Sequence, residues 1–260
     1  MVYNIKILAY SQVVFAILFL ATLVGISLGL LGAGGSVLAL PILRYAAHLP
    51  TAVAVPMSLA TVGAVSLVGV LSAGLQGRVR WKEGLTFALI GSLGTLVGVG
   101  LAGLLAEWLQ MLAFLLVVLV TALRMLRPPR GGEPAAEGPS FGWAGLLLRA
   151  LSVGMLTGVV GVGGGFLIVP ALVLLFGFSI REATATSLLV IAFNSGVGLA
   201  AYSRVVELDW GLGVRFTAAA LVGLFLGQAL ARKLPAAGLQ RLFGLLLLAV
   251  GAMIVVQEFL

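Results

Sequence analysis

One glycine motif occurs twice in this sequence, at the same place in each half of the chain. Gly-Ala-Gly-Gly-Ser-Val-Leu-Ala-Leu-Pro begins at Gly32, and Gly-Val-Gly-Gly-Gly-Phe-Leu-Ile-Val-Pro begins at Gly161, 129 residues later. From about residue 21 onward the same shift superimposes Gly25 on Gly154, Ser58 on Ser187, Ser66 on Ser195, Trp81 on Trp210, Gly94 on Gly223 and Gly98 on Gly227. Because the register is constant, we interpret the chain as a duplicated unit.

The composition indicates a membrane protein. Hydrophobic residues make up 62% of the 260 residues and charged residues only 9%, whereas a soluble domain carries about a quarter of charged residues. Backbone polar groups must be bonded internally in hydrocarbon, and the sequence lacks the alternation of porin strands, so we predict an all-α polytopic membrane protein. The apolar stretch from Leu8 to Leu31 leads directly into the first motif, so we expect a span rather than a cleavable signal peptide.

The net charge of +7 fits the same environment. The Lys and Arg residues lie mainly at the edges of apolar stretches, where they set orientation and contact anionic headgroups, so we expect the lipid bilayer as a partner and no nucleic acid. The chain has no cysteine, and its single histidine, His48, has no clear companion ligands. The sequence therefore predicts no metal site, no cofactor and, lacking any nucleophile–base pair, no enzyme.

The chain divides into a first membrane repeat, a cytoplasmic linker and a second membrane repeat, at 1–126, 127–143 and 144–260. Each repeat has a first helix, the glycine motif, a shorter arm and three ordinary spans. We expect these elements at 10–31, 36–47, 53–75, 83–105 and 108–126, and again at 144–160, 166–178, 182–203, 210–232 and 238–258. A full crossing needs about 20 residues, so each arm is either part of a re-entrant hairpin or a short, tilted span.

Both interpretations of the arm give each repeat an odd number of crossings, so we expect the two homologous halves to be inverted. With the N-terminus outside, basic residues gather on the inner side, as the positive-inside bias requires. The inner residues would be Arg78, Arg80, Lys82, Arg124, Arg127, Arg130, Arg149, Arg181, Arg232, Lys233 and Arg241. If each glycine segment is instead one broken span, the repeats are parallel and the basic residues divide less unevenly.

Each glycine motif allows the backbone to leave helical geometry, because glycine takes positive φ without steric cost. The next helix begins with unpaired amide N–H groups and a positive dipole, which makes an anion site without a charged side chain. The predicted substrate-binding residues of the motifs are Gly34, Gly35, Ser36, Gly163, Gly164 and Gly165. The predicted hinge positions are Gly32, Pro41, Gly161 and Pro170, where each proline would loosen its arm. Close helix packing is the alternative role of the glycines.

A second set of polar residues lies on the apolar segments that follow the arms. Its members are Ser58, Thr61, Thr186, Ser187, Asn194 and Ser195. Polar groups inside a span need partners, so we predict that these side chains line the substrate site and donate to an anion. Alternatively, the hydroxyls bond their own helix backbone. No Asp or Glu lies in the middle of a predicted span, so the sequence gives no sign of a proton relay.

The two motifs at 29–41 and 158–170, and the segment Arg-Glu-Ala-Thr-Ala-Thr-Ser from Arg181, resemble those of the TauE/SafE family of sulfite exporters. The resemblance covers nearly the whole chain. It implies an inner-membrane permease of two related halves and seven or eight spans, for sulfite, sulfonates or related organosulfur anions. Eight spans would correspond to the parallel arrangement. The first motif has Ser36 where the second has Gly165, so we expect two non-equivalent half-sites.

The sequence and this resemblance together predict a multi-pass secondary transporter of the cell inner membrane. Its substrate would be a small sulfur oxyanion or sulfonate, such as sulfite or sulfoacetate, bound between the halves and moved by alternating access. A passive anion channel and a non-transporting membrane assembly protein, whose glycines only pack, are the alternatives. The sequence is compatible with a homodimer but fixes neither the subunit number, the coupling ion nor the direction of transport.

Overall fold

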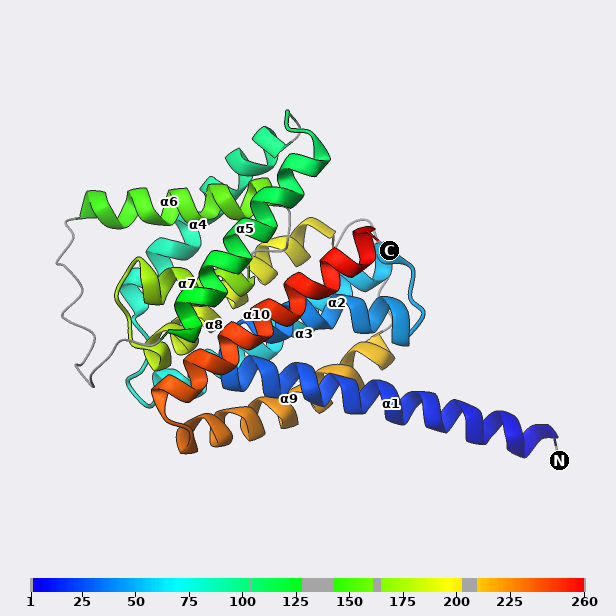
Figure 1. Cartoon of the computed structure of the whole chain (residues 1–260). Coiled ribbons are helices and arrows are strands. Elements are labelled where there is room, and N and C mark those ends of the chain that lie inside the picture. The colour runs from blue at the N-terminus through cyan, green and yellow to red at the C-terminus, as the bar shows by residue number, and fades with distance from the viewer. Residues whose placement is uncertain (1, 103, 128–142, 161–164, 203–209, 260) are drawn as a thin grey trace.

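The computed structural model describes residues 2–102, 104–127, 143–160, 165–202 and 210–259. This part of the chain is all-helical and contains no β-strand (Figure 1). The elements of the first half are α1 (Val2–Leu31), α2 (Gly34–Pro41), η1 (Ile42–Ala46), α3 (Thr51–Gly74), α4 (Trp81–Ala102) and α5 (Glu107–Leu126). Those of the second half are α6 (Trp143–Val160), α7 (Gly165–Leu174), α8 (Ile180–Tyr202), α9 (Trp210–Lys233) and α10 (Ala236–Phe259). The predicted linker falls almost wholly on 128–142, outside the described residues.

Every element expected from the sequence has a helical counterpart, and the prediction of an all-α polytopic chain is confirmed. Several boundaries differ, and the second arm ends at Leu174 rather than at residue 178. The first helix begins at Val2 rather than near residue 10, and its N-terminal part extends beyond the rest of the bundle (Figure 1). The first arm divides at Pro41, after which η1 continues as a π-helix. Proline has no N–H to donate, so the hydrogen-bond register shifts there, and the amide of Ala47 donates to Ile42 O at 3.1 Å.

Five helices in the described residues are long and apolar enough to cross a membrane. They are Thr51–Gly74, Trp81–Ala102, Trp108–Leu126, Ile180–Ala200 and Trp210–Lys233. Large apolar side chains are exposed on their outer faces. On α4, Leu85, Leu89, Leu93 and Leu96 form an exposed stripe at helical spacing. A stripe of this kind faces lipid in a membrane, where no polar outer surface is needed.

Two helix pairs are packed backbone to backbone through glycine, α1 against α9 and α4 against α6. A Cβ atom at Gly25 would overlap the carbonyl oxygen of Ala220, and one at Gly98 would overlap that of Met155. These glycines therefore allow close packing of the two helices in each pair. In each pair the first helix of one half, α1 or α6, contacts the second of the three ordinary spans of the other half, α9 or α4. Both pairs therefore join the two halves.

The remaining long helices pair with their counterparts, α3 with α8 and α5 with α10; the latter pair runs side by side in Figure 1. Successive contacts between α3 and α8 run forward along one helix and backward along the other. Gly198 lies against Leu59, and Gly69 lies against Leu188. The two helices are therefore antiparallel.

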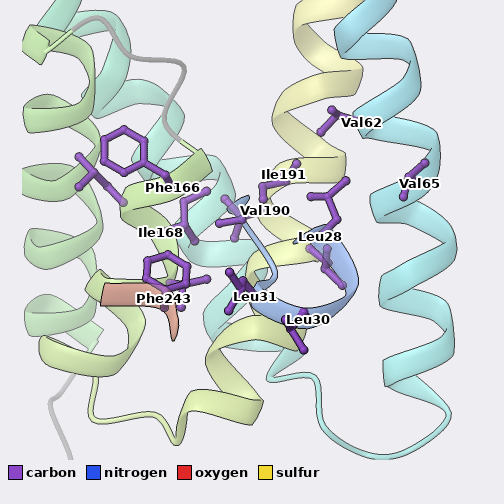
Figure 2. Close-up of a cluster of buried hydrophobic side chains, with 14 of the residues drawn as sticks. Leu28, Leu30, Leu31, Val62, Val65, Phe166, Ile168, Val190, Ile191 and Phe243 are labelled. Atoms are coloured by element: carbon purple, nitrogen blue, oxygen red, sulfur yellow. The ribbon is translucent and has the colours of Figure 1, made fainter. Parts of the chain in front are cut away.

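The short helix α7 and the first residues of α2 lie in the interior, where apolar side chains of distant segments meet. Figure 2 shows Leu28 and Leu31 of α1, Phe166 of α7 and Ile191 of α8 in one buried cluster. Every residue of α7 from Gly165 to Leu172 is buried. Residues Gly165 to Leu172 of the second arm are therefore enclosed by protein, so the first turn of α7 lies inside the bundle.

Candidate functional site

The first glycine motif turns the chain inside the bundle. Gly32 has φ of +77°, in the left-handed region, and α2 begins two residues later. A Cβ atom at Gly32 would lie 2.5 Å from Ser187 Oγ and 2.6 Å from Thr184 O, both on α8. Backbone conformation and lack of space therefore both require glycine at this position. The turn is seated directly on the first turns of α8.

The first turns of α2 and α7 meet at the centre of the bundle. A Cβ atom at Gly165 would overlap Ser36 Oγ and would lie 3.1 Å from Ser36 Cβ and 3.7 Å from Ile191 Cδ1. Ser36 and Gly165 are separated by the same 129 residues as the two motifs. Ser36 Oγ donates to Ala33 O at 2.7 Å, within its own motif. The structure thus brings corresponding positions of the two motifs into contact.

The other described site and hinge residues of the two motifs are buried glycines of the first motif and the two prolines. Gly34 and Gly35 are buried, and they pack against Ser27 and Leu28 of α1. Pro41 and Pro170 lie within α2 and α7, and Pro170 is buried. The predicted site and hinge residues of the second motif that lie outside the described residues are Gly161, Gly163 and Gly164.

Two of the predicted hydroxyl donors bond their own helices. Ser58 Oγ donates to Val55 O at 2.7 Å, and Ser187 Oγ donates to Thr184 O at 2.9 Å. In both cases the hydroxyl bonds the backbone carbonyl three residues earlier in its own helix, which is the local bonding named above as the alternative to a ligand contact. Ser187 nevertheless lies next to Gly32, so its oxygen borders the motif turn.

Three further predicted residues lie away from the motif turns. Thr61 Oγ1 accepts a hydrogen bond of 3.1 Å from Thr217 and lines a largely apolar cavity of about 330 Å³ between α3 and α9. Asn194 Oδ1 accepts from Ser92 Oγ at 2.9 Å, which joins α8 to α4. Ser195 is buried on α8, where its Cβ lies 3.0 Å from the position of a Cβ at Gly63. The structure therefore does not gather the whole predicted set around one cavity.

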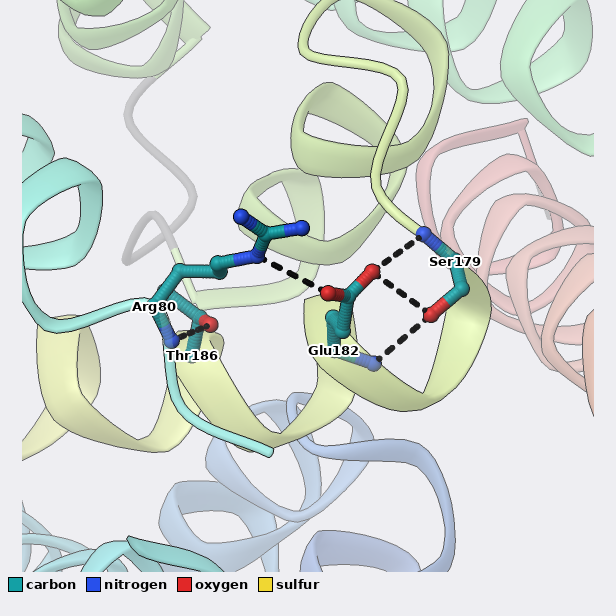
Figure 3. Close-up of polar contacts among 4 residues, drawn as sticks. All are labelled: Arg80, Ser179, Glu182 and Thr186. Carbon is teal, nitrogen blue, oxygen red and sulfur yellow. Dashed lines mark hydrogen bonds and ion pairs between the residues drawn. The ribbon is translucent and has the colours of Figure 1, made fainter. Parts of the chain in front are cut away.

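Thr186 connects the turn before α4 to the start of α8. Its Oγ1 accepts from the backbone N–H of Arg80 at 3.1 Å, and its side chain is fully buried. Beside it Arg80 Nε contacts Glu182 Oε1 at 2.8 Å, and Glu182 Oε2 accepts from both the amide and the hydroxyl of Ser179 (Figure 3). The partner of Thr186 is 106 residues away in the chain, so nothing in the local sequence indicates it.

Thr186→Val should lower the free energy of unfolding by about 0.5–1.5 kcal/mol, because it removes the acceptor of the part-buried Arg80 amide. Thr186→Ser keeps the hydroxyl and should cost much less. Arg80→Ala removes an ion pair whose arginine is 53% exposed, so it should cost less than about 1 kcal/mol. Thermal unfolding of the purified protein in detergent ranks the three variants. A valine variant as stable as the serine variant would contradict this role of Thr186.

The structure adds polar residues that the sequence reasoning did not select as site residues. Arg78, Arg181, Thr184 and Gln228 line a cavity of about 20 Å³ next to Gly29. Gln228 is an amide within the apolar helix α9, and a polar residue inside a span is a signal that could have identified it. From the sequence, Arg78 and Arg181 are expected only on the inner side of the membrane, and the fold alone places them together.

The model of the family described as "Sulfite exporter TauE/SafE" matches residues 17–254. The chain belongs to the TauE/SafE family. The resemblance inferred from the glycine motifs is thereby confirmed. With the apolar helices of the described residues, family membership makes this chain a multi-pass integral membrane protein and a membrane transporter.

Relatives of this TauE/SafE member are known by similar descriptions. A protein of Xylella fastidiosa (strain 9a5c), described as a probable membrane transporter protein, is 33% identical over 240 residues, which cover 90% of this chain and 91% of the relative. The probable membrane transporter protein YdhB of Bacillus subtilis (strain 168) is 27% identical over 225 residues, or 84% of this chain and 91% of YdhB. No solved structure matches the chain significantly.

Proposed function

We propose that this TauE/SafE protein is a secondary transporter that moves a small sulfur-containing anion, such as sulfite, sulfoacetate or another organosulfonate, across the inner membrane. The observation that supports it best is the contact between Ser36 and Gly165, which brings the start of α2 against the start of the buried helix α7. No side chain caps the N-terminus of α2, and the Ser36 amide donates to Ala33 O at 3.3 Å, so the amides of Gly34 and Gly35 are the ones that would serve a ligand. Helix N-termini of this kind favour anions.

Neutral donors suit a transported anion. Backbone amides and hydroxyls hold an oxyanion more weakly than buried cationic side chains do, because charge-assisted hydrogen bonds are roughly twice as strong as neutral ones. Ser187 beside the Gly32 turn and Ser36 at the contact of the two short helices are the nearest hydroxyls, and to donate to an anion each would have to release its bond to Thr184 O or Ala33 O. A site of this composition can both load and release its substrate.

Inverted repeats are the arrangement that we propose for the two halves. Corresponding helices α3 and α8 are antiparallel, as a two-fold axis in the membrane plane requires. Corresponding backbone bonds also close both arms. Ala47 N donates to Ile42 O as Phe176 N does to Ala171 O, and the two donors are 129 residues apart. In the parallel alternative, α3 and α8 would run in the same direction.

Alternating access would use the two glycine-packed pairs, α1 with α9 and α4 with α6. Backbone contact along each pair opposes sliding within it. Each pair contains one helix from each half, and the two pairs flank the central helices α2, α3, α7 and α8. We expect each pair to move as a unit past the central helices, so that the motif turns open to one side of the membrane at a time.

Flux into proteoliposomes tests the proposed function. We expect saturable uptake of sulfite or a sulfonate over sulfate and chloride, and faster uptake of labelled substrate into vesicles preloaded with unlabelled substrate. Counterflow requires a carrier whose site is exposed alternately, so currents without counterflow would favour the channel. Protein-free vesicles are the control. Absence of flux for every anion, with folded protein, would contradict the proposed function.

A further inference from the structure

Three arginines from different elements converge where α3 and α9 end and α8 begins. Arg78 lies in the turn after α3, Arg181 is the second residue of α8, and Arg232 is in the last turn of α9. Arg78 and Arg181 line the cavity of about 20 Å³, together with Thr184 and Gln228. The topology expected from the sequence places all three arginines on the inner side of the membrane, so this cavity would lie at the inner mouth.

The positive charge of this cluster has no carboxylate partner in the part of the chain that the structure describes. The one ion pair there joins Arg80 to Glu182. Partial burial lowers the pKa of Arg78, and the neighbouring cations Arg232 and Arg181 lower it further. Arginine stays protonated in proteins, so the three charges repel one another. A bound anion would remove this repulsion.

Hydrogen-bond donors of the cavity wall are held in place by backbone contacts. Arg181 Nη2 donates to Leu234 O at 3.1 Å, which fixes one edge of its guanidinium. Gln228 Nε2 donates to Gly69 O at 3.3 Å, while Gln228 Oε1 accepts from Ser72. An amide nitrogen carries two N–H donors, and the second one of Gln228 has no partner among the described residues. The cavity thus combines oriented donors with excess positive charge.

We propose that this cavity is a second oxyanion site, in which Arg78 and Arg181 capture the anion beside the first glycine motif. A volume of about 20 Å³ holds one water-sized group. One oxygen of sulfite or a sulfonate would enter it, and the guanidinium forks would bond the other oxygens. Gly29 lines the cavity and Thr184 packs against Gly32, so the captured anion would lie next to the motif turn.

The proposed site rests on the proposed function for the identity of its ligand, since it takes the anion that is transported. A phosphate group presents the same oxygens, and it could come from an anionic lipid headgroup at this depth. We favour the free anion because of where the cavity lies. It is between α8 and α9, next to the motif turn, and not on the exposed apolar faces of the helices.

Binding of sulfite to the full chain, purified in a neutral detergent and kept under argon, tests the site. Arg78→Gln and Arg181→Gln should each weaken sulfite binding by about tenfold or more, the effect of losing a hydrogen bond to a charged group. Arg241→Gln is the matched control, because Arg241 is an exposed arginine of α10 that does not line the cavity. Unchanged sulfite affinity in both cavity variants would overturn the proposal.

Thermal unfolding keeps the test independent of expression level and folding yield. In anion-free buffer Arg78→Gln should unfold at a higher temperature than the wild type, because it removes a repelling charge. Sulfite should raise the unfolding temperature of the wild type more than that of the variant, because a ligand stabilises only the state that binds it. An equal sulfite-induced rise in both proteins would overturn the proposal.

Flux and lipid composition separate the remaining outcomes. In neutral phosphatidylcholine vesicles the cavity variants should raise the KM for sulfite about tenfold and keep the maximal rate. If the wild type transports sulfite and the variants have the same KM, the arginine site is overturned but the proposed transport function stands. Arginine-dependent sulfite binding without any flux would support the site and overturn the proposed function. Arginine-dependent binding of phosphatidylglycerol, without binding of sulfite, would overturn the site for a free anion.

Discussion

Gly98→Leu should abolish the folded protein, whereas Gly100→Leu, two residues further along α4, should leave it intact. A Cβ atom at Gly98 would overlap Met155 O and would lie 2.9 Å from Gly158 Cα, so both obstacles are backbone atoms of α6. A Cβ atom at Gly100 meets nothing within 4 Å, and the residue is exposed on the same span. Overpacking a tight contact costs about 1–3 kcal/mol and sometimes more, and here the whole α4–α6 contact must open.

Size-exclusion profiles of the two variants in detergent measure this difference. Gly98→Leu should give aggregate or no protein, and Gly100→Leu should give the wild-type peak and an unfolding temperature within a few degrees of the wild type. Leucine at an exposed position of an apolar span suits the membrane. A Gly98→Leu protein that elutes and unfolds like the wild type would show that α4 and α6 are not in backbone contact.

Gly165→Ser should lower transport by about tenfold or more, and adding Ser36→Gly should restore most of it. The serine at 165 would collide with Ser36 at the contact of the two short helices. Relieving that collision requires displacement of α2 or α7, at a cost of about 1–3 kcal/mol. This corresponds to roughly five- to 150-fold in an equilibrium. The double variant exchanges the two side chains across the contact and restores the space.

Sulfite flux in proteoliposomes is the measurement, with Ser36→Gly alone as the control that should remain active. The unfolding temperature of each variant, recorded in parallel, separates lost transport from lost folding. Full activity of Gly165→Ser would contradict a close contact between the motifs. A double variant as inactive as the single one would show that the two positions do not share one space.

The elements of this fold could be predicted because their causes are local in the sequence. A span requires a run of about 20 apolar residues whose backbone bonds close within the segment. The span expected at 53–75 accordingly became α3, Thr51–Gly74, and that at 210–232 became α9, Trp210–Lys233. The division of the first arm at Pro41 also has a local cause, the missing N–H, but the sequence did not reveal the π-helical register of η1.

The candidate site was predicted less completely, because hydrogen-bond partners are chosen by the fold. Ser58 and Ser187 could be recognised as polar groups within spans, but the same residues satisfy their own helices. Thr186 as a donor to an anion stays a prediction, and the fold gives its Oγ1 a bond from the Arg80 amide that the local sequence does not indicate. Asn194 likewise has a partner, Ser92, on a helix of the other half.

The sequence by itself determined the membrane environment, the helical elements and the positions of the two glycine motifs. These follow from composition, from apolar run length and from the conformational freedom of glycine, all of which act within one segment. Only the tertiary structure decided that Ser36 meets Gly165, that α1 packs on α9, and that Arg78 and Arg181 share a cavity. Such contacts join residues more than 100 positions apart, and they depend on how whole helices pack rather than on any residue's own preference.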